Sequence, residues 1–149
     1  MDESGHILVA EDSAVDAFFL QRAFNRAGMA VTLHVVRDGQ EVVDYLEGVG
    51  QFRDRARNPL PRLLLLDLHM PRLNGFDVLR WLRQRPAFQG LEVVIFTSSE
   101  EPRDVNRAFG LGANAYLVKP HSIDELNALV GRFKKSWFEP KRAPQRKAA

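Results

Sequence analysis

Arg62-Leu63-Leu64-Leu65-Leu66-Asp67 is the most apolar stretch of this 149-residue chain, and it ends on a carboxylate. Four successive leucines show no alternation with polar residues, which is typical of a parallel strand that is buried on both faces. Such a strand needs helices on both sides of its sheet. The stretch therefore predicts an α/β protein in which Asp67 lies at the carboxyl end of a central strand.

Strand and helix patterns alternate on both sides of this stretch. Short apolar runs indicate the strands, and apolar residues at helical spacing indicate the helices. The expected strands are 6–10, 31–36, 62–67, 91–96 and 114–118, and the expected helices are 14–27, 40–47, 76–84, 101–111 and 122–137. Because right-handed crossovers place helices on both faces, this order predicts a doubly wound parallel five-stranded sheet in a three-layer (βα)5 architecture.

The composition is that of one globular domain. With 45% hydrophobic residues the chain can bury a core, and no apolar run approaches the roughly 20 residues of a membrane span. Residues 1–5 form a short acidic leader without the basic and apolar regions of a secretion signal, so we expect a cytoplasmic protein. The absence of cysteine excludes disulfides, a thiol nucleophile and thiolate metal sites.

The end of the chain is basic. Residues 138–149 carry four basic side chains and one acidic one, whereas the net charge of the whole chain is only +2. A basic tail could touch nucleic acid, but a short segment that contains proline and alanine is more often flexible and solubilising. We therefore expect one domain over 6–137, followed by a basic tail over 138–149 that is flexible or serves as a dimer arm.

Polar side chains of complementary charge follow the expected strands. Glu11 and Asp12 come after the first strand, Asp67 after the third, Thr97 after the fourth and Lys119 after the fifth. In an open parallel sheet, ligands bind beyond the carboxyl ends of the strands, so these side chains are expected to meet at one edge.

The three carboxylates can share one site only when a cation neutralises them. Oxygen ligands without cysteine or a histidine pair suit Mg²⁺, with Mn²⁺ as a substitute. A bound ion of this kind accepts phosphoryl oxygens, which makes Asp67 a candidate nucleophile for phosphoryl transfer. Lys119 and Thr97 would then stabilise charge on the transferring group.

Four motifs together match one protein family. They are LVAEDS at 8–13, LLLDLHMP at 64–71 with Gly75, IFTS at 95–98 and ANAYLVKP at 113–120. With these motifs the chain resembles the receiver domains of two-component response regulators over residues 6–137. The resemblance implies the flavodoxin-like receiver topology, Mg²⁺-dependent transfer of a phosphoryl group from a histidine kinase phosphohistidine to Asp67, and signalling through phosphorylation-dependent protein contacts.

The resemblance also implies roles for the residues of the site. Asp12 and Asp67 would bind the metal directly, Glu11 would help through water, and the backbone carbonyl of His69 would complete the protein ligands. The phosphoryl group would be held by Thr97, Lys119 and the backbone of Ser98.

The resemblance further implies which residues govern the conformational switch and the lifetime of the phosphoryl group. Tyr116 matches an aromatic residue that turns inward when the threonine, here Thr97, moves toward the phosphoryl group. Pro120 matches a position that is usually a cis proline. His69 and Ser99 match positions that flank the path of the attacking water and tune the phosphoryl lifetime. We therefore expect a stoichiometric phosphoacceptor with intrinsic autodephosphorylation rather than an enzyme.

The helix expected over 14–27 has two faces. One face is a stripe that is expected to point toward the core, and it consists of Asp16, Leu20, Ala23, Phe24 and Ala27. Val15, Phe18 and Arg22 lie on another face beside the acidic pair, where the family docks its histidine kinase. An isolated surface aromatic residue is the alternative reading of Phe18.

The partners are expected to be proteins. Too few residues follow the last expected helix for a DNA-binding output domain, so the output would be contact with an effector or a downstream phosphotransfer protein. The loop 48–61, the segment 111–116 and the aromatic pair Trp137 and Phe138 look most like single-domain regulators paired with phytochrome-type kinases. Trp137 and Phe138 either fold back onto the core or bury against a second subunit, and we expect a symmetric homodimer.

Three other classes differ at particular residues. A nucleotide- or flavin-binding protein would need a glycine- or hydroxyl-rich loop where Glu11 and Asp12 would repel phosphate. A metal-dependent phosphatase with an aspartyl nucleophile would place a second aspartate at the position of His69. A pseudo-receiver that binds partners without phosphorylation would lack some of the five key residues, and none is missing.

Overall fold

Strands and helices alternate along the whole described chain. The structure, a computed structural model, describes residues 5–137. Its strands are β1 (His6–Ala10), β2 (Thr32–Val36), β3 (Leu63–Leu66), β4 (Glu92–Thr97) and β5 (Ala115–Val118). Its helices are α1 (Ala14–Arg26), α2 (Gly39–Glu47), α3 (Gly75–Arg83), α4 (Pro102–Gly110) and α5 (Ile123–Trp137), with short 3-10 turns η1 (Gly50–Phe52) and η2 (Pro86–Phe88).

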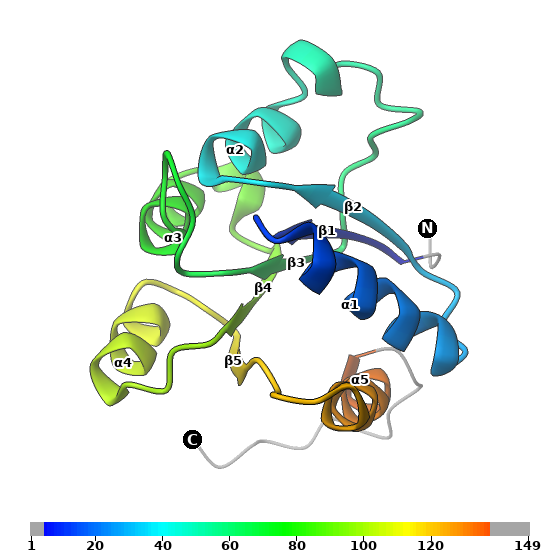
Figure 1. Ribbon diagram of the computed structural model, residues 1–149. Helices are drawn as coiled ribbons and strands as arrows, with labels where there is room; N and C mark the ends of the chain where they lie inside the picture. Colours follow the sequence, from blue (N-terminus) through cyan, green and yellow to red (C-terminus); the bar gives the residue numbers. More distant parts are fainter. Residues whose placement is uncertain (1–4, 138–149) are drawn as a thin grey trace, which may run out of the picture.

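The five strands form one parallel sheet in the order β2-β1-β3-β4-β5. In Figure 1, α1 and α5 lie together on one face of this sheet, and α2, α3 and α4 cover the other. The strand order reverses between β1 and β3, and such a switch point is where ligands bind in sheets of this kind. The predicted doubly wound, three-layer fold is confirmed.

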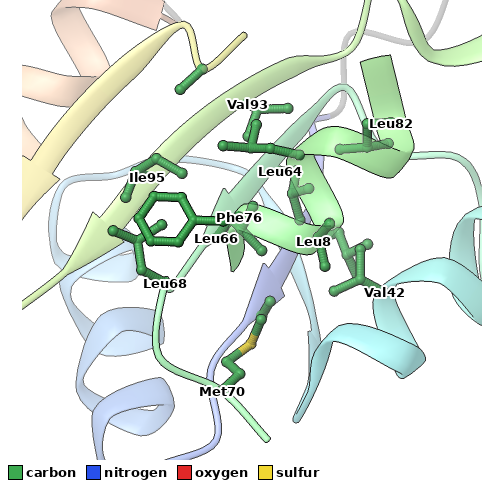
Figure 2. Close-up of a cluster of buried hydrophobic side chains, with 14 of the residues drawn as sticks. Leu8, Val42, Leu64, Leu66, Leu68, Met70, Phe76, Leu82, Val93 and Ile95 are labelled. Atoms are coloured by element: carbon green, nitrogen blue, oxygen red, sulfur yellow. The ribbon is translucent and has the colours of Figure 1, made fainter. Parts of the chain in front are cut away.

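Strand β3 contacts both hydrophobic cores. Leu64 and Leu66 belong to the cluster under α2 and α3, which Figure 2 shows packed around Phe76, whereas Leu63 and Leu65 belong to the cluster under α1 and α5. All four leucines are buried, and each buried leucine contributes about 1.5–3 kcal/mol. The uninterrupted leucine run therefore reflects burial on both faces, as its pattern predicted.

Side-chain caps set where three helices begin near the carboxyl edge of the sheet. The hydroxyl of Ser13 accepts the amide of Asp16 at 3.1 Å at the start of α1, and Asp38 caps α2 in the same way. Asn74 and Asp77 form a reciprocal capping box at the start of α3. Because each cap satisfies an amide that the helix leaves unpaired, the caps fix the direction in which each loop leaves its strand.

The polar segment 48–61 is a surface connection, but it is tied firmly to the domain. It contains η1, and the Arg55 guanidinium donates to the carbonyls of Tyr45, Leu46 and Asn58 at 2.7–2.9 Å. Two of these carbonyls lie in the last turn of α2, where helix geometry leaves carbonyl groups short of donors. One arginine therefore joins the loop to the helix that precedes it.

The last helix ends in an aromatic contact. The ring of Trp137 lies 5.9 Å from that of Phe133 and packs against the core cluster under α1 and α5, so Trp137 folds back onto its own chain. Phe138, its predicted companion at a dimer interface, lies outside the described residues. Within residues 5–137, no helix combines the length and the apolar character that crossing a membrane requires.

Candidate functional site

Three carboxylates meet where β1 and β3 end. Glu11, Asp12 and Asp67 each offer an oxygen, and these oxygens all lie within 4.8 Å of one another. Glu11 and Asp67 are buried, whereas Asp12 is exposed. Burial raises the pKa of the Glu11 carboxyl, and Lys119 offsets this increase only in part. A set of hard oxygen ligands with one open side fits a divalent cation such as Mg²⁺, which keeps several of its waters.

Lys119, which follows β5, binds two of these carboxylates. Its Nζ lies 2.8 Å from Oδ2 of Asp67 and 2.5 Å from Oε1 of Glu11. Burial alone would lower the pKa of Lys119, but the hydrogen bonds and charges of Asp67 and Glu11 outweigh it and raise the pKa to about 12. The ammonium group therefore remains charged at neutral pH and balances part of the acidic cluster.

Thr97, the last residue of β4, carries an unmet hydrogen bond. The residue is fully buried, and within residues 5–137 its Oγ1 is the buried side-chain polar atom that has no partner. Its backbone carbonyl accepts the amide of Lys119 at 2.8 Å, so the ends of β4 and β5 are joined. A buried hydroxyl without a partner costs about 1–3 kcal/mol, which indicates a ligand that would supply the bond.

The loop after Asp67 brings a backbone donor to the carboxylate. The amide of His69 donates to Oδ1 of Asp67 at 3.1 Å, while the side chain of His69 is exposed. Gly75 packs behind the loop, where a Cβ would lie 2.5 Å from the carbonyl oxygen of Asp67. Only glycine therefore allows the start of α3 to approach the segment that follows β3 this closely.

The expected switch residues lie beside the loop between β4 and α4. Tyr116 is half-buried, and its hydroxyl donates to the backbone carbonyl of Ser99 at 3.0 Å. Burial raises the pKa of the Tyr116 hydroxyl, so it remains a donor at neutral pH. Ser98 follows Thr97 directly and is exposed at the rim of the site.

The prediction of a cis bond before Pro120 is wrong. All peptide bonds within residues 5–137 are trans. The trans form before proline is the more stable by about 0.5–1 kcal/mol, and Lys119 reaches Asp67 with this trans bond.

The expected orientation of Asp16 is also wrong, and the structure gives this residue a different neighbour. The Asp16 side chain is half exposed instead of facing the core, and its Oδ2 lies 3.6 Å from Nζ of Lys119. Capping by Ser13 places Asp16 in the first turn of α1. The cap was visible in the sequence, and it could have identified Asp16 as a fourth carboxylate at this edge.

The predicted docking face is exposed. Val15 and Phe18 are 63% and 57% exposed, which is unusual for large apolar side chains, and Arg22 is exposed beside them. The Phe18 ring makes an edge contact with the ring of Phe19 at 5.4 Å. Leu20 faces the core, as predicted for the other side of α1.

Comparison with known proteins gives consistent matches along the chain. A family model described as "Response regulator receiver domain" matches residues 7–131. The crystal structure of response regulator RPA3017 in red light signaling of R. palustris has a TM-score of 0.86 and 37% identity, covering 95% of this chain and 99% of that one.

Two cyanobacterial proteins extend the comparison. Response regulator Rcp1 of Synechocystis sp. is 31% identical over 133 residues, covering 89% of this chain and 88% of Rcp1. The Mn²⁺-bound form of Rcp1 has a TM-score of 0.82 and 30% identity, over 95% of this chain and 99% of that one. The phosphorylated cyanobacterial phytochrome response regulator RcpA has a TM-score of 0.83 and 26% identity, with the same coverage. The similarity therefore extends over nearly the whole chain.

Proposed function

The chain belongs to the response regulator receiver family of two-component signalling, and from that premise we propose that it accepts a phosphoryl group on Asp67 from the phosphohistidine of a histidine kinase. One observation carries the proposal: an acidic cluster, a charged lysine and a buried hydroxyl without a partner meet at one edge of the sheet. The acidic cluster suits a divalent cation, and the other two groups suit the oxygens of a phosphoryl group.

In the proposed reaction, a carboxylate oxygen of Asp67 attacks phosphorus. The new O–P bond forms as the P–N bond of the phosphohistidine breaks, and the imidazole of the kinase leaves with the bonding electrons. Asp12, Asp67 and the His69 carbonyl would hold Mg²⁺, with Glu11 acting through water. The ion would supply positive charge that lets phosphoryl oxygens approach these carboxylates.

The remaining groups of the site would receive the phosphoryl oxygens. Lys119 carries its charge at neutral pH and would exchange its contact with Asp67 for a phosphoryl oxygen. The Thr97 hydroxyl would gain the hydrogen bond that it lacks, and the Ser98 amide would add another donor. Movement of Thr97 toward the phosphoryl group, with Tyr116 following, would report phosphorylation to the surface around α4 and β5.

The relatives support the metal and the modification. Rcp1 has been crystallised with Mn²⁺, and RcpA has been crystallised in a phosphorylated form. We therefore propose Mg²⁺, or Mn²⁺ in its place, as the cofactor. The protein would be a stoichiometric phosphoacceptor with intrinsic autodephosphorylation rather than an enzyme, and His69 and Ser99 would tune the lifetime of the phosphoryl group.

The proposed kinase is of the phytochrome type. RPA3017 is described in red light signaling and RcpA as a phytochrome response regulator, which favours this class of kinase. The exposed face with Val15, Phe18 and Arg22 would dock the kinase beside the acidic cluster. We further propose a receiver domain over 6–137, flanked by a leader and a basic tail, in a homodimer that hands the signal to an effector or phosphotransfer protein.

The test is direct modification of the full chain. Incubation with acetyl phosphate and Mg²⁺, followed by peptide mass spectrometry, is expected to locate one phosphoryl group on Asp67. Omission of the metal should abolish the modification because it removes the cation. The substitution Asp67→Asn should abolish it because it removes the carboxylate nucleophile.

Asp124→Asn is the matched control. Asp124 is an exposed carboxylate in the first turn of α5 and is not a member of the acidic cluster, so this variant should be modified like the wild type. An unmodified Asp67 in the presence of Mg²⁺ would disprove the phosphoacceptor proposal and favour a receiver that binds partners without phosphorylation.

A further inference from the structure

Ser99 ties the loop between β4 and α4 to two other elements. Its hydroxyl donates to Oδ2 of Asp104 on α4 at 2.6 Å and accepts the amide of Glu101 at 3.3 Å. Its backbone carbonyl accepts the hydroxyl of Tyr116 from β5 at 3.0 Å. Ser99 stands two residues after Thr97, so these bonds also limit where the end of β4 can lie.

The link between Ser99 and Asp104 replaces the usual cap of α4. Glu101 is the N-cap of this helix, and its side chain makes no capping hydrogen bond. In a capping box the third helical residue accepts the amide of the N-cap directly. Here the Ser99 hydroxyl lies between the two, accepting the Glu101 amide and donating to Asp104. The start of α4 is therefore coupled to the loop rather than closed on itself.

The length of this bond and the surroundings of Asp104 indicate a firm contact. A distance of 2.6 Å is at the short end of the range for hydrogen bonds donated by hydroxyl groups. Asp104 is half-buried, so water competes less for its oxygens than at the exposed carboxylates of the surface.

We propose that Asp104 is a positioning residue for phosphoryl transfer, acting through the Ser99 hydroxyl to hold the Thr97 loop and the Tyr116 hydroxyl in one arrangement. This inference rests on the proposed function. Asp104 touches neither the acidic cluster nor Lys119; it acts on the side of the site that would receive the phosphoryl oxygens. Removal of Asp104 frees the Ser99 hydroxyl and lets the loop and Tyr116 take other positions.

The chain offers a direct spectroscopic readout, because it has only two tyrosines. In protein labelled with 3-fluorotyrosine, the ¹⁹F resonance of Tyr116 is sensitive to the position of the loop between β4 and α4. Tyr45, whose hydroxyl donates to the carbonyl of Pro59 in the connection between α2 and β3, serves as an internal reference. We expect Asp104→Ala to shift the ¹⁹F resonance of Tyr116 and to leave that of Tyr45 in place.

The same variant should slow phosphorylation by acetyl phosphate by roughly three- to tenfold, since the Thr97 hydroxyl is less well placed. Asp104→Asn keeps an acceptor oxygen and should restore most of the rate and the Tyr116 resonance. Ser99→Ala should reproduce Asp104→Ala, and the double variant should be no slower than either single one, because both remove the same contact.

Asp124→Ala is the matched control, because Asp124 is an acidic residue in the first turn of α5. It should change neither readout. Asp104→Ala could instead lower thermal stability while the Tyr116 resonance stays in place and the phosphorylation rate stays within twofold of wild type. In that case Asp104 only caps α4 and the inference is wrong. A wild-type chain that is never phosphorylated would instead reject the proposed function, and the Tyr116 resonance would still test the positioning of the loop.

Discussion

The two loops that border the Asp67 carboxylate are built differently. The loop between β3 and α3, residues 68–74, is packed against α2 and α3 through backbone contacts and an ion pair. The loop between β4 and α4, residues 98–101, is tied through Ser99 and follows a threonine whose buried hydroxyl has no partner. The Asp67 carboxylate is thus held on a fixed frame, whereas the side that is proposed to contact phosphoryl oxygens retains an unmet hydrogen bond.

The fixed frame depends on a few specific contacts. Arg72 donates to both carboxylate oxygens of Asp38 at 2.8 and 3.2 Å. It does so from a left-handed backbone conformation, φ 68°, that few residues other than glycine adopt. Gly39, in the first turn of α2, lies so close to Leu73 that a Cβ would be 2.2 Å from its carbonyl oxygen. The loop and α2 therefore pack as one unit.

Among these variants, Gly39→Ala should have the largest effect on stability, because the new methyl group meets the backbone of Leu73, which cannot move aside. We expect a loss of about 3 kcal/mol in the free energy of unfolding, measured by urea denaturation. Gly131→Ala, in α5, is the matched control, because a Cβ there meets open space and should stabilise the helix by about 0.5–1 kcal/mol. Equal stability of the two variants would contradict the idea of a rigid frame.

Thr97→Val tests the unmet hydrogen bond next to the second loop, which connects β4 to α4. The substitution removes a buried hydroxyl without a partner and keeps its shape, so we expect a gain of about 1–2 kcal/mol in the free energy of unfolding without ligand. The same change should slow phosphorylation, since the proposed donor is gone. Thr32→Val, at an exposed position of β2, should give no comparable gain. A destabilised Thr97→Val protein would show that the hydroxyl is satisfied in solution.

Arg72→Ala should have the smallest effect, and that effect should depend on pH. Burial alone would raise the pKa of Asp38, but the hydrogen bond from Arg72 and backbone amides lowers it overall. A carboxyl whose pKa is lower in the folded state adds stability above its unfolded pKa of about 4 and loses it as the pH falls further. The difference in urea midpoint between wild type and Arg72→Ala should therefore be larger at pH 6 than at pH 3.

Arg80→Ala removes a similar exposed contact, with Asp77 on α3, and is the control for Arg72→Ala. Its difference from wild type should be small at both pH values. A deficit of Arg72→Ala that is constant with pH would mean that the arginine acts through packing of its aliphatic part, with no contribution from the charge of Asp38.

The fold and the meeting of the site residues could be predicted because both follow from the backbone. Four consecutive leucines require burial on both faces, and parallel strands connected by helices bring their carboxyl ends to one edge. Asp67, Lys119 and Thr97 follow different strands, so their proximity needed no knowledge of side-chain conformation. The expected element boundaries differ from the observed ones by a few residues at most, and end residues are the least determined by pattern.

The contacts between side chains of different elements could not be predicted in the same way. Asp104 meets Ser99 only because the β4–α4 loop turns back over the first turn of α4, and no sequence pattern states the path of that loop. Asp16 was expected in the core from helical spacing alone, but the cap by Ser13 places it toward Lys119. The geometry at Pro120 follows from local energetics that a family resemblance does not determine.

The dispersion of the site over the chain has a consequence for its assembly during synthesis of the chain. Its groups come from the ends of β1, β3, β4 and β5, and Lys119 is joined to Thr97 through the backbone of the edge strand. No short peptide from this chain contains the set, and a nascent chain that ends before Lys119 would lack the ammonium that balances the carboxylates. The proposed uptake of a phosphoryl group should therefore require that the last strand, β5, has docked on the sheet.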